Sequence, residues 1–187
     1  MVGGGDSGAS APRFWAEAAQ ISASNSGSGT SSCRASLSRV ALARRSTAAL
    51  AAGVEVRCTV QPIRVRGVPA QLAEVFSNLI ANAIRYNNSG GHVDVTLSQM
   101  NGSAVLTVAN DGAGIPQEAL PFVFDRFFQV DPARSRKSGG AGLGLALAQR
   151  IVRAHGGELA VASRFGIGST FTVTLPAQAA GDGKSGS

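Results

Sequence analysis

The sequence predicts an α+β fold: a two-layer α/β sandwich whose mixed, mostly antiparallel sheet is covered by helices on one face. The first observation is an amphipathic helical pattern within residues 69–87, and the second is an alternating pair of strands joined by Asn101-Gly102. The third is a closing strand pair within residues 158–176, which follows another helical pattern. A single sheet with helices on one side is the simplest arrangement that buries both kinds of apolar face.

The two ends of the chain are expected to lack regular structure. Residues 1–35 and 177–187 are dominated by Gly, Ser and Ala and show no sustained periodicity, which is typical of disordered or low-complexity sequence. Residues 36–176 are the expected folded domain. It starts with a helix that ends at Gly53, followed by the alternating strand "VEVRCTV", in which Cys58 should face the core.

The helix over residues 69–87 has the clearest pattern in the chain. Its apolar residues recur at intervals of three and four, so they form one face that should pack on the sheet. Pro69 stands near the start, where its missing N–H is tolerated. The apolar residues are Leu72, Val75, Phe76, Leu79, Ile80, Ala83 and Ile84.

The later elements follow from the same periodicities. The strands "HVDVTLSQ" and "SAVLTVAN" flank Asn101-Gly102, a typical hairpin turn. A short helix, "QEALPFVFDRFF", leads into a polar segment at 129–141, and the next helix, "GLGLALAQRIVRAHGG", ends at glycines. The strands "ELAVAS" and "STFTVTLP" are expected to form the closing hairpin.

Composition narrows the function without deciding it. The chain has 187 residues, a net charge of +6 and 44% hydrophobic residues, enough for one core. The charge would suit any polyanion, but the arginines are dispersed without interleaved aromatic residues, which argues against a nucleic-acid partner. No apolar run is long enough to span a membrane. Cys33 and Cys58 lack metal or redox spacing, which favours reduced thiols and a cytoplasmic location.

Asn78, Asn82 and Arg85 share one side of the 69–87 helix, at positions i, i+4 and i+7. A solvated polar face is the simpler explanation. Asparagine is a poor helix former, however, so two in line with a cation suggest that a ligand uses their amides. An amide oxygen can ligate Mg²⁺, a hard cation that proteins often share with phosphate oxygens, and Arg85 would then meet the phosphates.

The glycines of "GGAGLGLA", residues 139–146, come after a polar loop and before a helix. N–H groups at a helix start bind anions, and glycine lets a phosphate approach closely. A dinucleotide fingerprint is the alternative, but the spacing here is Gly-x-Gly-x-Gly and no strand precedes it. The pattern therefore favours a phosphate site over a dinucleotide site.

Five motifs, in order, resemble the N, G1, F, G2 and G3 boxes of the ATP-binding catalytic domain of sensor histidine kinases. They cover roughly Gly67 to Pro176, and the resemblance implies the Bergerat-type sandwich of a superfamily that includes gyrase and mismatch-repair ATPases. It also implies ATP and Mg²⁺ as cofactors, with a mobile lid at 129–141. The motifs are "NLIANAIRY" (78–86), "NDGAGIP" (110–116), "FDRFF" (124–128), "GGAGLGLALA" (139–148) and "GIGSTFTVTLP" (166–176).

The resemblance also implies roles for individual residues. Asn82 would ligate Mg²⁺, with Asn78 and Arg85 near the phosphates, so these three are the expected catalytic residues. The G1 glycines would let the chain pass close to the adenine, the G2 glycines would bind phosphate, Thr170 would lie near the adenine end, and Phe128 belongs to the box that anchors the lid. The expected nucleotide-binding residues are Asn110, Gly112, Gly114, Ile115, Phe128, Gly140, Gly142, Leu143, Gly144 and Thr170.

The residue one helical turn before the metal-binding Asn separates subfamilies. Hydrolysing relatives generally carry a Glu there, which activates water as a general base. Here that position is Asn78, an amide that takes no proton at neutral pH. The sequence therefore favours transfer of the phosphoryl group over its hydrolysis.

The G1 box departs from the family pattern, which usually begins with an Asp that accepts from the adenine amino group. Asn110 stands in that place and Asp111 is one residue along; a one-residue shift turns a side chain to the other face, so Asp111 cannot substitute. We expect ATP binding that is weakened by about 1 kcal/mol, roughly five- to tenfold, but not abolished. The NH₂ group of Asn110 could also face the O6 of guanine, which would soften base discrimination.

A phosphoacceptor histidine is missing from its expected place. His92 begins a strand and His155 lies in "AHGG", and neither has the helical setting of a sensor-kinase acceptor. The favoured interpretation is an incomplete protein-histidine kinase that transfers phosphate in trans to a His on a separate protein and, through it, to a response regulator. The alternatives are a degenerate nucleotide-binding regulator without transfer activity, or a Ser/Thr kinase or slow ATPase of the same superfamily.

Overall fold

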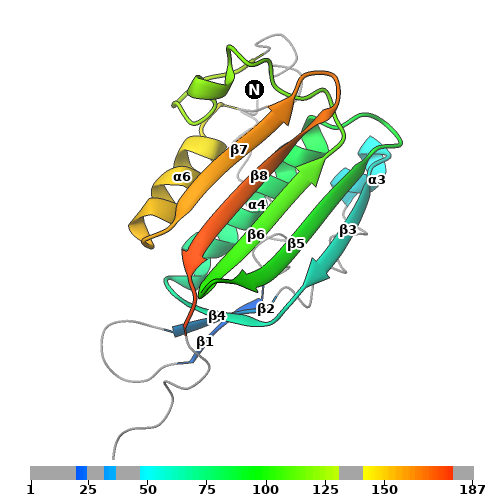
Figure 1. The fold of residues 1–187 in the computed structure, drawn as a ribbon. Coiled ribbons are helices and arrows are strands. Elements are labelled where there is room, and N and C mark those ends of the chain that lie inside the picture. Colours follow the sequence, from blue (N-terminus) through cyan, green and yellow to red (C-terminus); the bar gives the residue numbers. More distant parts are fainter. Residues whose placement is uncertain (1–19, 25–31, 37–46, 131–140, 179–187) are drawn as a thin grey trace, which may run out of the picture.

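The computed structural model describes residues 20–24, 32–36, 47–130 and 141–178, whose centre is a five-stranded sheet of order β3-β5-β6-β8-β7 (Figure 1). The β3–β5 pair is parallel and the other three pairs are antiparallel. This is the mixed, mostly antiparallel sheet that the sequence predicts. Its strands are β3 (Glu55–Val60), β5 (His92–Met100), β6 (Ser103–Asn110), β7 (Glu158–Arg164) and β8 (Gly168–Pro176).

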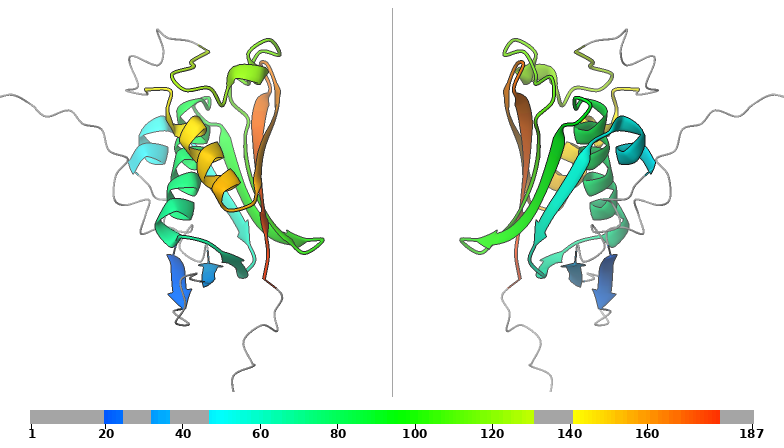
Figure 2. Two further views of the ribbon diagram at one scale, coloured as in Figure 1. Left: turned by 90° about the vertical axis from the view of Figure 1, so that its left-hand side faces the viewer. Right: turned by 90° about the vertical axis from the view of Figure 1, so that its right-hand side faces the viewer.

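Three helices lie on one face of this sheet, while the described part of the chain leaves the opposite face uncovered (Figure 2). They are α3 (Thr47–Ala52), α4 (Pro69–Arg85) and α6 (Gly144–Ala154). The predicted two-layer sandwich is therefore confirmed. No helix among the described residues is long and apolar enough to cross a membrane.

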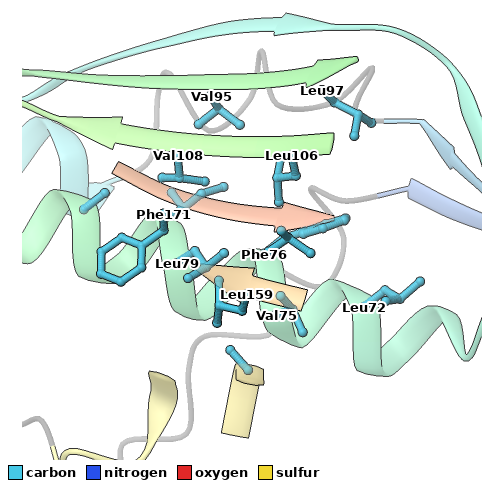
Figure 3. Packing of buried hydrophobic residues seen from close by; sticks show 14 of the residues in the cluster. Leu72, Val75, Phe76, Leu79, Val95, Leu97, Leu106, Val108, Leu159 and Phe171 are labelled. Carbon is cyan, nitrogen blue, oxygen red and sulfur yellow. The ribbon is translucent and has the colours of Figure 1, made fainter. Parts of the chain in front are cut away.

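The core lies between α4 and the sheet and holds the helix in a fixed rotation. Leu72, Val75 and Leu79 of α4 are fully buried, and each contributes about 1.5–3 kcal/mol by its removal from water. With its apolar stripe turned to the sheet, α4 presents Asn78 and Asn82 along another side. The labelled core residues in Figure 3 are Leu72, Val75, Phe76 and Leu79 of α4 and Val95, Leu97, Leu106, Val108, Leu159 and Phe171 of the sheet.

Turn chemistry in the sequence correctly predicts two element boundaries. Asn101 and Gly102 have φ values of 49° and 75°, as a two-residue type I′ hairpin turn requires. Gly53, with φ of 64°, ends α3, and the N–H of Val54 donates to the carbonyl of Ala49 at 2.9 Å. The remainder of the expected first helix, residues 37–46, lies outside the described residues. Cys58 shares the inward face of β3 and packs, partly buried, against the core.

The structure differs from expectation at β4 (Ile63–Arg66), a strand that the sequence pattern does not predict. This short strand pairs with β2 (Ser32–Ser36), which in turn pairs with β1 (Gln20–Ser24) in a second, three-stranded sheet. The sequence predicts no regular structure for β1 and β2. β2 adds to the edge of β4 and β1 to the edge of β2, and a strand set by its pairing partner carries little signal in its own composition.

The expected short helix over "QEALPFVFDRFF" is also wrong. The structure has a series of turns around one 3-10 helix, η1 (Leu120–Phe122). Pro121 lies within the segment, and a proline inside a helix removes one backbone donor and clashes with the preceding turn. The segment therefore forms a compact loop that leads from the G1 motif across the end of the sheet.

Candidate nucleotide-binding site

A cavity of about 310 Å³ lies between α4 and the end of the sheet where β6 finishes. Its size lies within the range of small-molecule sites, and each of the five sequence motifs contributes at least one residue to its wall. The lining residues are Asn82, Ala83, Tyr86, Asn110, Ala113, Gly114, Ile115, Val123, Phe128, Gln129, Val130, Leu145, Phe165, Ser169 and Phe171. Segments far apart in the sequence thus meet at one place.

The amides of Asn78 and Asn82 are one helical turn apart on α4, and both side chains are half-buried. Neither has a hydrogen-bond partner among the described residues. Asn82 lines the cavity, and Asn78 lies beside the first residue of α6, since a Cβ on Gly144 would stand 3.2 Å from Asn78 Oδ1. The beginning of α6 has no side-chain cap, so its first N–H groups are available to an anion at this point.

Arg85 is the last residue of α4 and is half-buried outside the cavity lining. Its guanidinium pairs with no group in the described part of the chain. Phosphates bound near Asn82 would therefore meet the Arg85 guanidinium only if they extended beyond the cavity lining.

Asn110 lies at the end of β6 with its amide between two backbone groups. Oδ1 accepts from the Gly112 N–H at 3.2 Å and Nδ2 donates to the Ser169 carbonyl at 3.1 Å, whereas the opposite orientation would place like groups together. The two bonds fix which end of the amide is the acceptor. One lone pair of Oδ1 and one N–H of Nδ2 remain for other partners.

Asp111 faces away from the cavity, as its one-residue shift predicts. Its Oδ1 accepts from the backbone N–H of His92 at 2.6 Å, and its Oδ2 is 3.1 Å from His92 Nδ1. Partial burial raises the pKa of the Asp111 carboxyl, but the hydrogen bonds from the His92 backbone and ring outweigh it and hold the pKa below its ordinary value. Asp111 borders an open hollow on the uncovered face of the sheet instead.

Two further asparagines join this carboxylate to the end of α4. Asn87 Nδ2 donates to the His92 carbonyl at 2.8 Å, and Asn87 Oδ1 accepts from the Asn88 N–H at 2.8 Å. Asn88 Nδ2 donates to the Asp111 carbonyl at 3.3 Å. We call Asn87, Asn88, His92 and Asp111 the bonded cluster; it ties the helix end, the start of β5 and the G1 motif together.

The G1 glycines accommodate close contacts within the protein, besides the expected approach to the adenine. A Cβ on Gly112 would overlap the Tyr86 carbonyl oxygen and lie 2.8 Å from Asn87 Cα. Gly114 has φ of 67°, and a Cβ there would lie 2.9 Å from Phe165 Cα. Gly114 does line the cavity, as does Ile115, but Gly112 is buried beneath the loop.

The G2 glycines divide in a similar way. Gly142 has φ of 68°, and a Cβ there would meet the Phe127 and Phe128 backbone at 2.8 Å, so this glycine is required for packing against the F motif and does not line the cavity. Leu143 is 37% exposed and also lies outside the lining. Gly144 remains beside Asn78, and Gly140 lies outside the described residues.

Thr170, which is expected near the adenine end, does not itself line the cavity. Because side chains alternate along a strand, Ser169 and Phe171 face the cavity, whereas Thr170 faces the uncovered side of the sheet. Ser169 is buried, and its Oγ lies 2.8 Å from Ser163 Oγ, which accepts from the Ile115 N–H at 2.8 Å. The inward alternation of β8, read from buried Phe171, is the signal that identifies Ser169.

The three aromatic residues of the F motif lie in different surroundings. Phe124 packs against the core and Phe128 lines the cavity. Phe127 has φ of 67° and is 67% exposed, and its N–H donates to the Gly142 carbonyl at 2.9 Å. Leu143 and Leu147, one turn apart and also exposed, continue the apolar surface from Phe127.

Both histidines of the chain are engaged in the fold. His155 Nε2 accepts from the Val68 N–H at 3.0 Å, and Nδ1 donates to the Ile151 carbonyl at 2.8 Å. This pair of bonds requires the neutral ring with its proton on Nδ1. The ring joins the end of α6 to the start of α4, while His92 lies between the carboxylates of Asp111 and Glu55, at 3.1 and 3.5 Å.

This sandwich, with five motifs around one cavity, defines a nucleotide-binding domain of the Bergerat type. Residues 67–179 match the family described as histidine kinase-, DNA gyrase B-, and HSP90-like ATPase, more than half of the chain, and the chain belongs to that family. The sequence resemblance to the ATP-binding catalytic domain of histidine kinases is thereby confirmed.

Similar proteins include several sensor kinases. The chain is 49% identical to the sensor histidine kinase RppB of Synechocystis over 110 residues, 59% of this chain and 24% of RppB. It is 40% identical to the sensor-like histidine kinase SenX3 of Mycobacterium tuberculosis over 138 residues, 73% of this chain and 34% of SenX3. The chain thus spans about a quarter of RppB and about a third of SenX3.

Solved structures give the same result for the fold. The mycobacterial sensor histidine kinase MprB superposes with a TM-score of 0.61 at 33% identity, covering 76% of this chain and 89% of that one. Full-length ShkA in complex with AMPPNP superposes with a TM-score of 0.63 at 27% identity, covering 75% of this chain and 29% of ShkA.

Proposed function

We propose that this chain binds Mg-ATP in the cavity and transfers the γ-phosphoryl group to a histidine on a separate protein, which would pass it to a response regulator. The observation that carries the proposal is a pair of amides without a partner among the described residues: Asn82 lines the cavity, and Asn78 lies beside Gly144 at the start of α6. Unused polar groups on a rigid helix are expected where a ligand supplies the partner.

The residues at this end suit a metal shared with phosphates. Asn82 Oδ1 would hold Mg²⁺, which commonly takes one or two protein oxygens and completes its shell with phosphate oxygens and water. The metal would neutralise charge on the transferred group. The start of α6 and Asn78 would orient the phosphates, and positioning of this kind supplies most of the catalysis in phosphoryl transfer.

Asn110 would recognise the adenine amino group through Oδ1. The bonds to Gly112 and Ser169 leave one lone pair of Oδ1 and one N–H of Nδ2 for a nucleobase. The same amide could therefore donate to the O6 of guanine, which supports the softened base discrimination that the sequence suggests. Only the charge assistance of the usual Asp would be lost.

Two features support transfer in trans: the bonds of the two histidines and the exposed apolar side chains. Both rings are bonded within the fold, so a separate acceptor is favoured. Phe127, Leu143 and Leu147 form an exposed apolar surface beside the cavity, a feature typical of docking sites, and a helix that carries the acceptor would dock there. Its use of ATP would place this activity in the cytoplasm.

Calorimetric titration with Mg-ATP tests the binding step. We expect a dissociation constant between micromolar and millimolar for the native chain, and at least roughly tenfold loss in Asn82→Ala, which removes a charge-assisted contact. GTP titrated alongside measures how far the base is discriminated. Asn88→Ala is the matched control, because Asn88 belongs to the bonded cluster outside the cavity. Absence of Mg-ATP binding by the native chain would overturn the proposal.

Incubation with γ-labelled ATP and a His-bearing helical partner tests the transfer step. Label should appear on the partner and be lost with Asn82→Ala. Label retained on His92 or His155 would contradict transfer in trans. ATP binding without transfer to any acceptor would favour the nucleotide-binding regulator, and steady phosphate release without an acceptor would favour the ATPase alternative.

A further inference from the structure

Phe165 is an exposed aromatic residue in the cavity wall to which the proposed chemistry gives no role. It lies in the turn between β7 and β8, is 67% exposed, and lines the cavity. A large apolar side chain exposed at the mouth of a hollow is unfavourable in water unless something covers it.

The turn that carries Phe165 is fixed to the G1 motif. The Gly166 N–H donates to the Ala113 carbonyl at 2.7 Å, and the Ile167 N–H donates to the Arg164 carbonyl at 3.0 Å. Gly114 allows the two loops to touch, because a Cβ there would overlap the Arg164 carbonyl oxygen and lie 2.9 Å from Phe165 Cα. The Phe165 backbone is therefore held beside the loop that begins at Asn110.

Phe165 also lies at the base end of the cavity. Its turn directly precedes β8, whose Ser169 carbonyl holds the amide of Asn110, and Ser163 just before the turn bonds to Ile115. We propose that Phe165 is a nucleotide-binding residue whose ring stacks on the nucleobase and covers it from solvent. This inference rests on the proposed binding of ATP and adds a base contact to it.

The expected effect follows from base–aromatic stacking. Removing one such contact weakens binding by a factor of about 5 to 100, and the loss should depend on an aromatic face, since a Leu of comparable size has no π-system. Ile167 provides a matched control: it lies in the same turn and is 56% exposed, but it borders the hollow on the uncovered face of the sheet.

The test is Mg-ATP titration of the native chain and of four variants, with thermal denaturation to confirm folding. We expect Phe165→Ala to bind roughly 5- to 100-fold more weakly, Phe165→Leu to fall between Ala and native, Phe165→Trp to bind like native, and Ile167→Ala to be unchanged. Fluorescence of the introduced Trp should change with ATP by an amount that the native chain does not show.

Three outcomes would overturn the stacking contact while leaving the proposed function intact. The first two are native affinity in Phe165→Ala, and equal affinity in Phe165→Leu and the native chain. Loss in Ile167→Ala as large as in Phe165→Ala would also overturn it, because the effect would then belong to the turn as a whole. Failure of the native chain to bind Mg-ATP would remove both proposals.

Discussion

Four asparagines lie on or just beyond α4, and they divide into two pairs that the structure treats differently. Asn78 and Asn82, within the helix, have no partner among the described residues. Asn87 and Asn88, just after it, belong to the bonded cluster, and Asn87 is 6% exposed with both ends of its amide bonded. One residue type thus serves two purposes a few residues apart: polar groups left free where a ligand is expected, and groups fully paired where the chain must hold its shape.

The largest effect is expected at Gly112, which packs against the end of α4 beside Asn87. Gly112→Ala would push a Cβ into the Tyr86 carbonyl and against Asn87 Cα, and neither backbone atom can move cheaply. Overpacking of this kind costs about 3 kcal/mol, a fall of roughly 12 °C or more in Tm for a domain of this size. Urea and thermal denaturation measure it, with exposed Gln117→Ala in the same loop as the control. Native stability in Gly112→Ala would mean that the loop is not held against the helix end.

The next prediction compares one asparagine from each pair, in stability and in Mg-ATP affinity. Asn87→Ala removes a buried amide that bonds to the His92 carbonyl and to the Asn88 N–H, and should cost about 1–3 kcal/mol of unfolding free energy, with Mg-ATP affinity unchanged in the folded protein. Asn82→Ala should do the reverse: stability within about 0.5 kcal/mol of native and impaired binding. Denaturation and titration of both variants give the comparison. If either variant lost both properties equally, the division between free and bonded amides would be wrong.

The smallest effect concerns the stability that Asp111 of the bonded cluster contributes, and its loss at low pH. Because the pKa of Asp111 is lower in the folded protein, its contribution is complete above the ordinary carboxyl pKa of about 3.9 and is lost as the pH falls through the folded value. The side chain is 48% exposed, so the contribution is about 1 kcal/mol or less. Asp111→Asn should be slightly less stable than native at pH 7, and the difference should disappear on acidification. A difference that grew below pH 4 would contradict the lowered pKa.

The sequence predicts the elements that carry their own periodicity or turn chemistry. The helix starting at Pro69 and the hairpin at Asn101-Gly102 need no information from elsewhere, and both are present as predicted. β2 forms against the edge of β4 and β1 against β2, and the loop at Pro121 replaces an expected helix. These elements depend on pairing or on a single interrupting residue, so a local pattern does not identify them.

The candidate site was predictable as a set of motifs but not as a set of contacts. Asn82, Asn110, Gly114, Ile115 and Phe128 do line one cavity. The glycines that instead accommodate neighbouring backbone could not be distinguished from ligand-facing ones, because a close approach between distant segments leaves no trace in either segment. The inward alternation of β8 would have identified Ser169 in place of Thr170, while Phe165 became visible only through the contact between two loops.

The position of β8 has a mechanical consequence. The strand runs from Ser169, at the cavity, to Pro176, and it is hydrogen-bonded along its length to both β6 and β7. Just beyond it, the Gln178 N–H donates to the Arg64 carbonyl at 2.9 Å, at the end of the sheet opposite the cavity (Figure 1). A load applied at Gln178 would be resisted in shear by two antiparallel ladders before it reached the cavity, so the protein can be anchored at this end while the cavity faces solution undisturbed.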